Sequence, residues 1–247
     1  MRLNVFLQKA GVGSRREAER LVAEGRVKIN GTVALATTPA EDGDVITLDG
    51  KAVAPSTKPL PRLFVLNKPL DVLVTHRDHK GRRTIFDLTA MNAPDLPRLM
   101  NVGRLDVNSE GLLLLSSDGP LAQALMSPET ALSRIYRVRV RGRLKPENIT
   151  TLADGIVVDG VNYRGAEFVE YDSGGRSNTW YRVALTEGKN REIRKLMEHF
   201  GCVVNRLIRV QYGPFYLGKL QSGALEEIEP ARVEQLLAYL AERGVVI

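Results

Sequence analysis

The first fifty residues contain two short helical patterns followed by three strand-like runs. Apolar residues within 3–10 recur at the spacing of one helix face, and glycines at 11 and 13 end that helix. The run Ser14-Arg15-Arg16-Glu17 is a capping box, which predicts that a second helix begins there and ends before Gly25. The strands that follow are expected at Val27–Ile29, at Val33 after an Asn30-Gly31 turn, and at Val45–Leu48.

From residue 62 onward, strand-like runs outnumber helical ones. The strand-like runs are Leu63–Leu66, Leu112–Ser116, Tyr136–Val140, Ile156–Val158, Phe168–Tyr171, Trp180–Leu185 and Leu207–Val210. Helical patterns occur at 121–126, 146–152, 191–200 and 230–242. Because strands and helices do not alternate strictly, a doubly wound parallel sheet is disfavoured. The pattern predicts an α+β fold in which a mixed, mainly antiparallel sheet carries flanking helices.

A proline-rich stretch separates these two patterns. Residues 54–61 hold three prolines in the run Ala-Pro-Ser-Thr-Lys-Pro-Leu-Pro, which favours an extended, semi-rigid spacer. We therefore expect a small N-terminal domain over residues 1–55, a linker over 56–61 and a larger domain over 62–247.

Composition favours a polyanionic partner and argues against a metalloprotein. The 247 residues carry a formal net charge of +6, and the pI is near 9.5. One cysteine and three histidines cannot furnish the usual zinc sets, so we expect no metal and no cofactor. The chain start lacks a signal-peptide apolar core, and no apolar run approaches the ~20 residues needed to span a bilayer. We expect a cytoplasmic protein with no membrane partner.

Basic residues are concentrated in the helical start of the chain. Residues 1–30 hold seven Lys or Arg against three Glu. The candidates for a polyanion contact are Lys9, Arg15, Arg16, Arg20, Arg26 and Lys28. The alternative is a solvated helix face in which Arg16 and Arg20 pair with nearby glutamates.

A polar loop between two apolar runs is the most informative feature of the larger domain. The stretch Asn101-Val-Gly-Arg-Leu-Asp106-Val-Asn-Ser-Glu-Gly111 places one carboxylate, Asp106, where a reactive side chain would be held by rigid strands. A calcium loop is rejected, because leucines fill its later positions and Ser117 stands where a bidentate Glu is needed. A simple polar turn with a solvated carboxylate remains the alternative.

A second group of charges lies near the start of the predicted helix 191–200. Arg191, Arg194 and Lys195 stand where the helix dipole disfavours cations, which suggests that an anion lies beside some of them. The alternative is that they are solvated or paired with nearby glutamates. A carboxylate in a cleft that excludes water needs such a cation, so we expect one of these side chains beside Asp106.

The strand run around residues 133–143 has two different faces. Arg137, Arg139, Arg141 and Arg143 alternate with Tyr136, Val138 and Val140. The arginine face is either a contact for polyanion phosphates or a soluble strand face. Tyr136 lies on the apolar face, where a tyrosine is usually a core residue with a satisfied hydroxyl.

Two family resemblances sharpen these expectations. The N-terminal pattern resembles the S4 RNA-binding domain, with matches at Ser14, Arg15, Arg16, Ala18, Leu21, Gly25, Val27, Asn30 and Gly31. The Gly-Arg-Leu-Asp loop resembles the signature of pseudouridine synthases, and Asn190-Arg-Glu-Ile-Arg194 resembles a later motif of the bacterial ribosomal enzymes. Together they resemble the S4-bearing RsuA/RluB/RluE/RluF family. The resemblance implies a catalytic domain with the mixed sheet described above.

The resemblance also implies roles for particular residues. Asp106 would be the essential catalytic group, acting as nucleophile or base, and Arg194 would pair with it, with Arg191 as the next choice. Tyr136 would stack on the target base, and Arg104 would enter the space that the flipped base leaves. The remaining RNA contacts would come from the basic residues of the S4-like domain, from Ser14 at its helix entry and from Arg191.

The expected function is therefore the isomerisation of a specific uridine to pseudouridine in ribosomal RNA, more specifically large-subunit (23S) RNA. The partner would be a 23S hairpin or a pre-ribosomal particle, and the protein a monomer. Three alternatives remain: a small-subunit (16S) synthase, a non-catalytic RNA-binding assembly factor, and a nucleoside hydrolase. A hydrolase would normally require further opposed carboxylates in the site.

Overall fold

The chain forms two compact units. A computed structural model describes residues 2–10, 12, 15–35, 37–41, 43–54, 59–92, 96–172 and 178–245. One unit contains residues 1–61 and 229–247, and the other contains residues 62–228. Ser14, the predicted capping residue, lies outside the described residues, as do the side chains of Lys9, Arg15 and Arg16.

The first unit begins with two helices on a small antiparallel sheet. Helices α1 (Leu3–Lys9) and α2 (Arg15–Ala23) are followed by strands in the order β2-β1-β3-β4. The strands are β1 (Val27–Ile29), β2 (Thr32–Val33), β3 (Ile46–Leu48) and β4 (Lys51–Val53). The buried core joins both helices to the sheet through Leu3, Leu7, Ala18, Leu21, Val22, Val27 and Ile46. The helical spacing read from the sequence is confirmed, whereas β4 was not predicted.

The C-terminal helix follows its sequence pattern closely. Helix α7 spans Pro230–Glu242 and begins with proline at its first turn, where the missing N–H costs nothing. Its buried residues are Val233, Leu236 and Leu240, which lie on one helix face.

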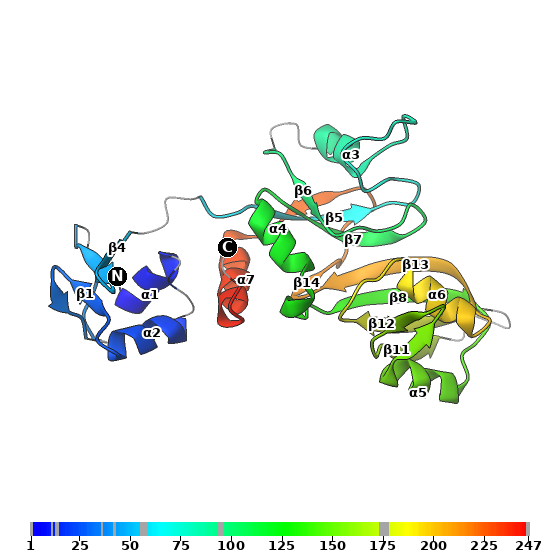
Figure 1. The fold of residues 1–247 in the computed structure, drawn as a ribbon. Helices are drawn as coiled ribbons and strands as arrows, with labels where there is room; N and C mark the ends of the chain where they lie inside the picture. Colours follow the sequence, from blue (N-terminus) through cyan, green and yellow to red (C-terminus); the bar gives the residue numbers. More distant parts are fainter. Residues whose placement is uncertain are drawn as a thin grey trace. The chain divides into compact units, whose positions relative to one another are not determined.

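The larger unit is built on one mixed sheet with the strand order β11-β12-β8-β13-β7-β5-β15 (Figure 1). Strand β14 extends β13, and β6 pairs with β7. The strands are β5 (Leu63–Lys68), β6 (Met100–Val102), β7 (Glu110–Ser116), β8 (Arg134–Arg141), β11 (Glu167–Asp172), β12 (Asn178–Leu185), β13 (Val203–Tyr212), β14 (Phe215–Tyr216) and β15 (Leu225–Glu227). The β7–β13 pair is parallel and the other pairs are antiparallel, so the predicted sheet type is confirmed.

Helices cover parts of this sheet, and a hairpin stands beside it. The helices are α3 (Ile85–Asn92), α4 (Gly119–Met126), α5 (Pro146–Asp154) and α6 (Glu192–His199), with a 3-10 turn at Pro128–Thr130. The hairpin pairs β9 (Ile156–Val158) with β10 (Val161–Tyr163). Helix α6 packs against β13 and α5 against β11, and their apolar residues join the main core. Helix α3 and strands β6, β10, β14 and β15 were not predicted from the sequence.

The parallel contact between β7 and β13 depends on Gly111. Its φ is +104°, and a Cβ built there would lie 2.3 Å from the backbone oxygen of Arg209. Only glycine allows the two strands to approach this closely. The Asp106 loop enters β7 immediately before this point, so Gly111 fixes where the loop lies against β13.

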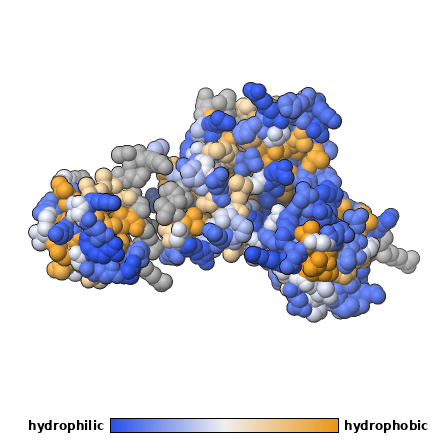
Figure 2. Space-filling model, in the orientation of Figure 1, coloured by the Kyte–Doolittle hydropathy of each residue, from blue (hydrophilic) through white to orange (hydrophobic). Residues whose placement is uncertain are grey.

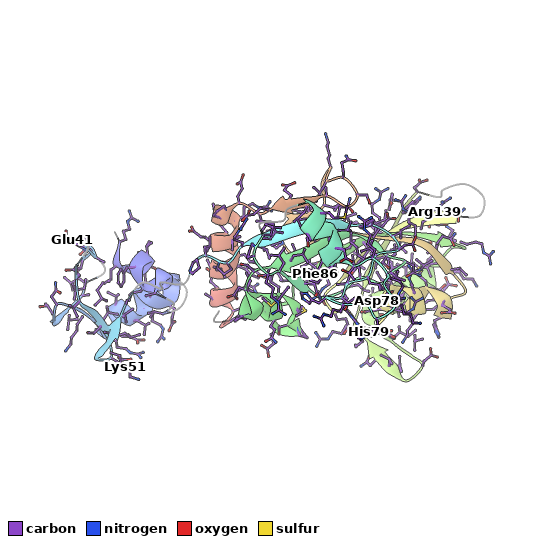
Figure 3. All side chains as sticks on the ribbon, turned by 90° about the horizontal axis from the view of Figure 1, so that it is seen from above. Glu41, Lys51, Asp78, His79, Phe86 and Arg139 are labelled. Atoms are coloured by element: carbon purple, nitrogen blue, oxygen red, sulfur yellow. The ribbon has the colours of Figure 1, made fainter. Side chains whose placement is uncertain are left out.

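The visible surface of the larger unit is mostly hydrophilic (Figure 2). Figure 3 labels Asp78 and His79 in the loop before α3, Phe86 on α3 and Arg139 on β8. Within that loop, Asp78 accepts hydrogen bonds from the backbone N–H groups of Lys80 and Arg82. No helix among the described residues is long and apolar enough to cross a bilayer.

Candidate active site

A cleft of about 700 Å³ opens in the larger unit. Its walls come from the loop between β6 and β7, from the start of β8, from the segment 185–193 that joins β12 to α6, and from β13. Asp106, Tyr136, Arg104 and Arg191 all line it. The structure thus brings into one cleft residues that lie as much as 87 positions apart in the chain.

Asp106 lies in a loop held at both ends by hydrogen bonds. The backbone N–H of Ser109 donates to the backbone oxygen of Asp106 (3.0 Å), and the Asn101 side chain donates to the oxygen of Gly103 (2.8 Å). The Asp106 side chain is 35% exposed, so its carboxylate faces the cleft and is partly shielded from water. A fixed, half-buried carboxylate of this kind is suited to act on a bound molecule.

Two arginines approach the same oxygen of Asp106. Arg191 Nη1 lies 3.4 Å from Oδ2, and Arg194 Nε lies 3.9 Å from it. The Arg191 side chain is 45% exposed, whereas that of Arg194 is 11% exposed. The structure therefore places both sequence candidates beside Asp106, with Arg191 the nearer and Arg194 the more buried.

Arg194 also ties the Asp106 loop to the sheet. Its Nη2 donates to the backbone oxygen of Asn108 (2.8 Å), and its Nη1 donates to that of Val204 in β13 (3.1 Å). Burial and the neighbouring Arg191 lower the pKa of Arg194, and the Asp106 carboxylate opposes that shift. Arg194 is thus a structural cross-link as well as a partner of Asp106.

Arg191 owes its position to an unusual backbone. It precedes the first residue of α6 with φ +52° and ψ +31°, a left-handed conformation that a non-glycine residue rarely adopts. This turn directs its guanidinium toward Asp106, and the sequence pattern gives no sign of it. Helix α6 begins one residue later than expected, at Glu192.

Lys68 is a charged residue of the site that the sequence analysis missed. Its side chain is fully buried at the end of β5, and its Nζ donates to the backbone oxygens of Ser109 (2.8 Å) and Pro69 (2.9 Å). Burial lowers its pKa to about 8, although Asp71, Asp106 and Glu110 favour the charged form. Lys68 thus fixes the Asp106 loop through its hydrogen bond to Ser109. In the sequence, this lysine is marked only by an Asn-Lys-Pro run after an apolar strand.

Tyr136 and the neighbouring arginines occupy opposite faces of β8. Tyr136 is buried and lines the cleft, and the burial pattern along β8 confirms the predicted alternation. Arg137 lies on the other face, where its guanidinium packs over the rings of Trp180 (5.2 Å) and Tyr171 (5.8 Å). Arg104 is exposed at the cleft edge.

A buried and a partly buried carboxyl group lie near each other at the wall of the cleft. Glu192 is almost fully buried, and its Oε2 accepts a hydrogen bond from the backbone N–H of Lys189 (2.9 Å). Burial raises its pKa to about 7, and the nearby Glu187 adds to the shift. Glu187 accepts from the Lys189 ammonium (2.7 Å) and the backbone N–H of Arg164 (2.8 Å), and its pKa is lowered by these partners against the effect of burial. The pair fixes the turn that carries Arg191.

Among the described basic side chains of the first unit, Arg20 and Arg26 pair with carboxylates. Arg20 bonds to Glu17 and Glu24, and Arg26 bonds to Asp49, all on the surface. Lys28 is exposed on β1. The predicted pairing of Arg20 with nearby glutamates is therefore present, and the side chains of Arg15 and Arg16 lie outside the described residues.

Comparison with known proteins identifies both parts of the chain. Residues 62–199 match the family model for RNA pseudouridylate synthase, and residues 1–46 match that for the S4 domain. An uncharacterized RNA pseudouridine synthase from Rickettsia felis is 40% identical over 239 residues, which cover 95% of this chain and 99% of that protein. A ribosomal large subunit pseudouridine synthase B from Pseudomonas aeruginosa is 39% identical over 243 residues, covering 95% of this chain and 61% of the relative.

A solved structure described as a pseudouridylate synthase shares the fold. Its TM-score is 0.60 at 22% identity, and the match covers 96% of this chain and 99% of the other. The matched ranges include the Asp106 loop, Tyr136 and the start of α6. The chain belongs to the RNA pseudouridine synthase family and carries an S4 domain at its N-terminus.

Proposed function

We propose that this enzyme converts one specific uridine of large-subunit ribosomal RNA to pseudouridine, with Asp106 as the essential catalytic residue. The observation that supports this most is the placement of Asp106, held between two arginines, in a cleft also lined by Tyr136. Relatives named ribosomal large subunit pseudouridine synthase B support the choice of substrate, and so does the S4 domain.

The proposed reaction can proceed with one catalytic carboxylate. It breaks the N1–C1′ bond of uridine, turns the base and forms a C5–C1′ bond, while C5 loses its hydrogen as a proton and N1 gains one. No electrons are transferred to or from the substrate. Asp106 would act on the ribose, either by attacking C1′ or by removing a proton from the sugar. The two arginines beside it would orient its carboxylate.

Tyr136 and Arg104 have separate roles in this proposal. The target uridine cannot reach Asp106 while it is stacked in RNA, so it must flip into the cleft. Tyr136 would stack against the flipped base, because its ring lines the cleft beside the Asp106 loop. Arg104, exposed at the cleft edge, would occupy the space that the base leaves.

Tritium release from RNA labelled at C5 of uridine tests the reaction. We expect the wild-type protein to release tritium while the base stays attached to the chain, and Asp106→Asn to release at least ~1000-fold less, a change of about 4 kcal/mol in activation free energy. Binding of RNA by Asp106→Asn should stay within about threefold. Release within about tenfold of wild type would reject Asp106 as the essential group.

Mapping pseudouridine in ribosomal RNA from cells that lack this protein tests the substrate. One large-subunit position should lose its modification, and the wild-type gene should restore it whereas Asp106→Asn should not. Loss at a small-subunit position would contradict the substrate and leave the reaction intact. Loss of ribosome assembly with every pseudouridine retained would instead indicate a non-catalytic RNA-binding role.

A further inference from the structure

Two buried arginines at the inner wall of the cleft take no part in the chemistry described above. Arg134 begins β8 and Arg209 lies in β13, and both line the cleft. Arg134 is 8% exposed and Arg209 is 3% exposed. Arginine is seldom buried to this degree without a partner of opposite charge.

The two guanidinium groups share one aromatic ring. Their central carbons lie 4.9 Å (Arg134) and 5.1 Å (Arg209) from the ring centre of Tyr212, which is itself buried. The Tyr212 hydroxyl donates to the backbone oxygen of Leu125 (2.8 Å) and accepts from Arg134 Nη2 (2.9 Å). The ring is therefore fixed in place, and it holds two like charges close together.

Neither arginine has a carboxylate within 4 Å among the described residues. Their remaining hydrogen bonds go to backbone oxygens, from Arg134 Nη1 to Thr186 (3.0 Å) and from Arg209 Nε to Leu112 (2.7 Å). Arg209 Nη2 is buried and makes no hydrogen bond. A desolvated cation with an unused donor is costly, and two together are more so, unless an anion joins them.

The carboxylates of the cleft are engaged elsewhere. Asp106 pairs with Arg191 and Arg194, and Glu187 pairs with Lys189. Glu192 accepts a hydrogen bond from the backbone N–H of Lys189. Five cationic and three acidic side chains line the cleft, which leaves a positive excess. The excess lies at Arg134 and Arg209, because the other wall cations are either paired or, like Arg104, exposed at the edge.

We infer that Arg134, Arg209 and Tyr212 form a subsite for one phosphate group of the bound RNA. Guanidinium groups match the oxygens of a phosphate with paired, charge-assisted hydrogen bonds. A cleft of about 700 Å³ has room for one flipped nucleotide with its phosphate. The inference rests on the proposed function, since RNA is what brings the phosphate into the cleft.

The strand register indicates which phosphate this is. Arg209 pairs directly with Tyr136 across β13 and β8, so their side chains stand on the same face of the sheet. If the flipped base stacks on Tyr136, the phosphate at Arg209 belongs to the target nucleotide or to its immediate neighbour. The subsite then holds the flipped nucleotide by its backbone while Asp106 acts on its sugar.

A methylphosphonate scan tests the subsite. In RNA hairpins that contain the mapped target uridine, each phosphate within three nucleotides of that uridine is replaced singly by a neutral methylphosphonate. Affinity and the rate of pseudouridine formation are measured for the wild type, Arg134→Gln, Arg209→Gln and the charge-preserving Arg134→Lys and Arg209→Lys. Arg182→Gln is the matched control, because Arg182 lies on β12 outside the cleft and bonds to Glu167.

We expect one phosphate next to the target uridine to be much more sensitive to neutralisation than the others. The wild type should lose about 10- to 100-fold in kcat/KM when that phosphate is neutralised, the usual effect of losing charge-assisted hydrogen bonds. Arg209→Gln and Arg134→Gln should show the same loss with unmodified RNA and less than about threefold further loss with that methylphosphonate. The lysine variants should recover part of the loss, and Arg182→Gln should behave as the wild type.

Three outcomes would overturn the subsite. One is a wild-type scan without a sensitive phosphate within one nucleotide of the target, a result that needs no variant and stands even if a glutamine variant unfolds. The second is independence of the two changes: at every position, the loss from the methylphosphonate would be as large in the glutamine variants as in the wild type. The third is full activity in both glutamine variants. If the wild type forms no pseudouridine, the proposed function is rejected instead. The affinities of the wild type and the variants for the modified RNAs would still show whether the arginines bind that phosphate.

Discussion

At the scale of single residues, the two arginines beside Asp106 perform different tasks. Arg194 is 11% exposed, and it joins Asn108 to Val204 through hydrogen bonds to their backbone oxygens. Arg191 is 45% exposed, and its side chain has Asp106 as its only polar partner among the described residues. Loss of Arg194 therefore removes a structural tie and a countercharge, whereas loss of Arg191 removes the countercharge alone.

We predict that Arg194→Ala lowers both stability and activity, and that Arg191→Ala lowers activity alone. The first should cost roughly 2–4 kcal/mol in unfolding free energy, because it leaves backbone oxygens unpaired and opens a void. The second should cost less than ~1 kcal/mol, as surface pairs do. Urea unfolding and tritium release measure the two effects. Equal destabilisation by both variants would contradict the division of tasks.

Glu192 should make the stability of this protein depend on pH. Its pKa of about 7 in the folded state lies above the ordinary value of 4.5, so the folded protein binds more protons than the unfolded chain between those values. Stability from this group is therefore lost as pH rises from about 5 to about 8. The maximum effect is roughly 3 kcal/mol, and the neighbouring Glu187 acts in the same direction as burial.

Glu192→Gln should remove this dependence, because the amide is neutral and has a similar shape. Relative to the wild type, the variant should gain stability progressively from pH 5 to pH 8 in urea unfolding. Glu198→Gln is the control, since Glu198 is exposed on the same helix. A stability difference between Glu192→Gln and wild type that stays constant over this range would show that Glu192 is ionised throughout.

The sequence identified the proposed catalytic residues better than the residues that support them. Asp106, Tyr136 and Arg191 stand in motifs with a recognisable order, and the structure brings them to one cleft. Lys68, Arg134, Arg209 and Glu192 were not recognised, because a charged residue in an apolar strand or at a helix start gives no sign of burial. Their burial is decided by residues distant in the chain, as when β5 and β7 enclose Lys68.

At the scale of elements, the approach of β7 to β13 is the least tolerant contact of the site. We predict that Gly111→Ala destabilises the protein by roughly 3–5 kcal/mol, because the added Cβ would meet the Arg209 backbone and the φ of +104° is unfavourable for alanine. Activity should fall with it, since the contact lies between the Asp106 loop and Arg209. Thermal and urea unfolding measure the stability change.

Gly160→Ala separates the two causes. Gly160 also has a positive φ, +75°, but a Cβ there would meet nothing within 4 Å. This variant should cost about 1–2 kcal/mol, the price of the backbone conformation alone. A Gly111→Ala variant no less stable than Gly160→Ala would mean that β13 moves away at little cost.

Elements with a strong hydrophobic period were located well from the sequence. Strand Ile156–Val158 and helix Pro230–Glu242 have the predicted bounds, and β8, β12 and β13 extend their predicted cores by a few residues. The strands that were missed, including β6, β14 and β15, are two or three residues long and are ordered by a neighbouring strand. Such strands carry too few alternating positions to be recognised in isolation.

At the scale of the whole molecule, the proposed function places catalysis in one unit and much of the RNA affinity in the other. Asp106, Tyr136, Arg191 and Arg194 all lie in residues 62–228. The S4 unit carries seven Lys or Arg in its first thirty residues, and Arg20 and Arg26 are already paired with carboxylates there. Charges that are neutralised within the protein release fewer counterions from RNA, so Arg20 and Arg26 are weaker candidates for phosphate contacts. Arg15 and Arg16 are candidates because they stand in the S4-like motif of the sequence.

We predict that the double variant Arg15→Glu, Arg16→Glu weakens RNA binding and lowers the slope of log affinity against log salt by about 2, one for each lost phosphate contact. The rate at saturating RNA should stay within about twofold of wild type, because neither residue belongs to the unit that contains Asp106. Arg15→Lys with Arg16→Lys preserves the charge and should retain the slope. Arg20→Glu should change it by less than 1. A collapse of the saturated rate with unchanged affinity would show that the S4 unit takes part in catalysis.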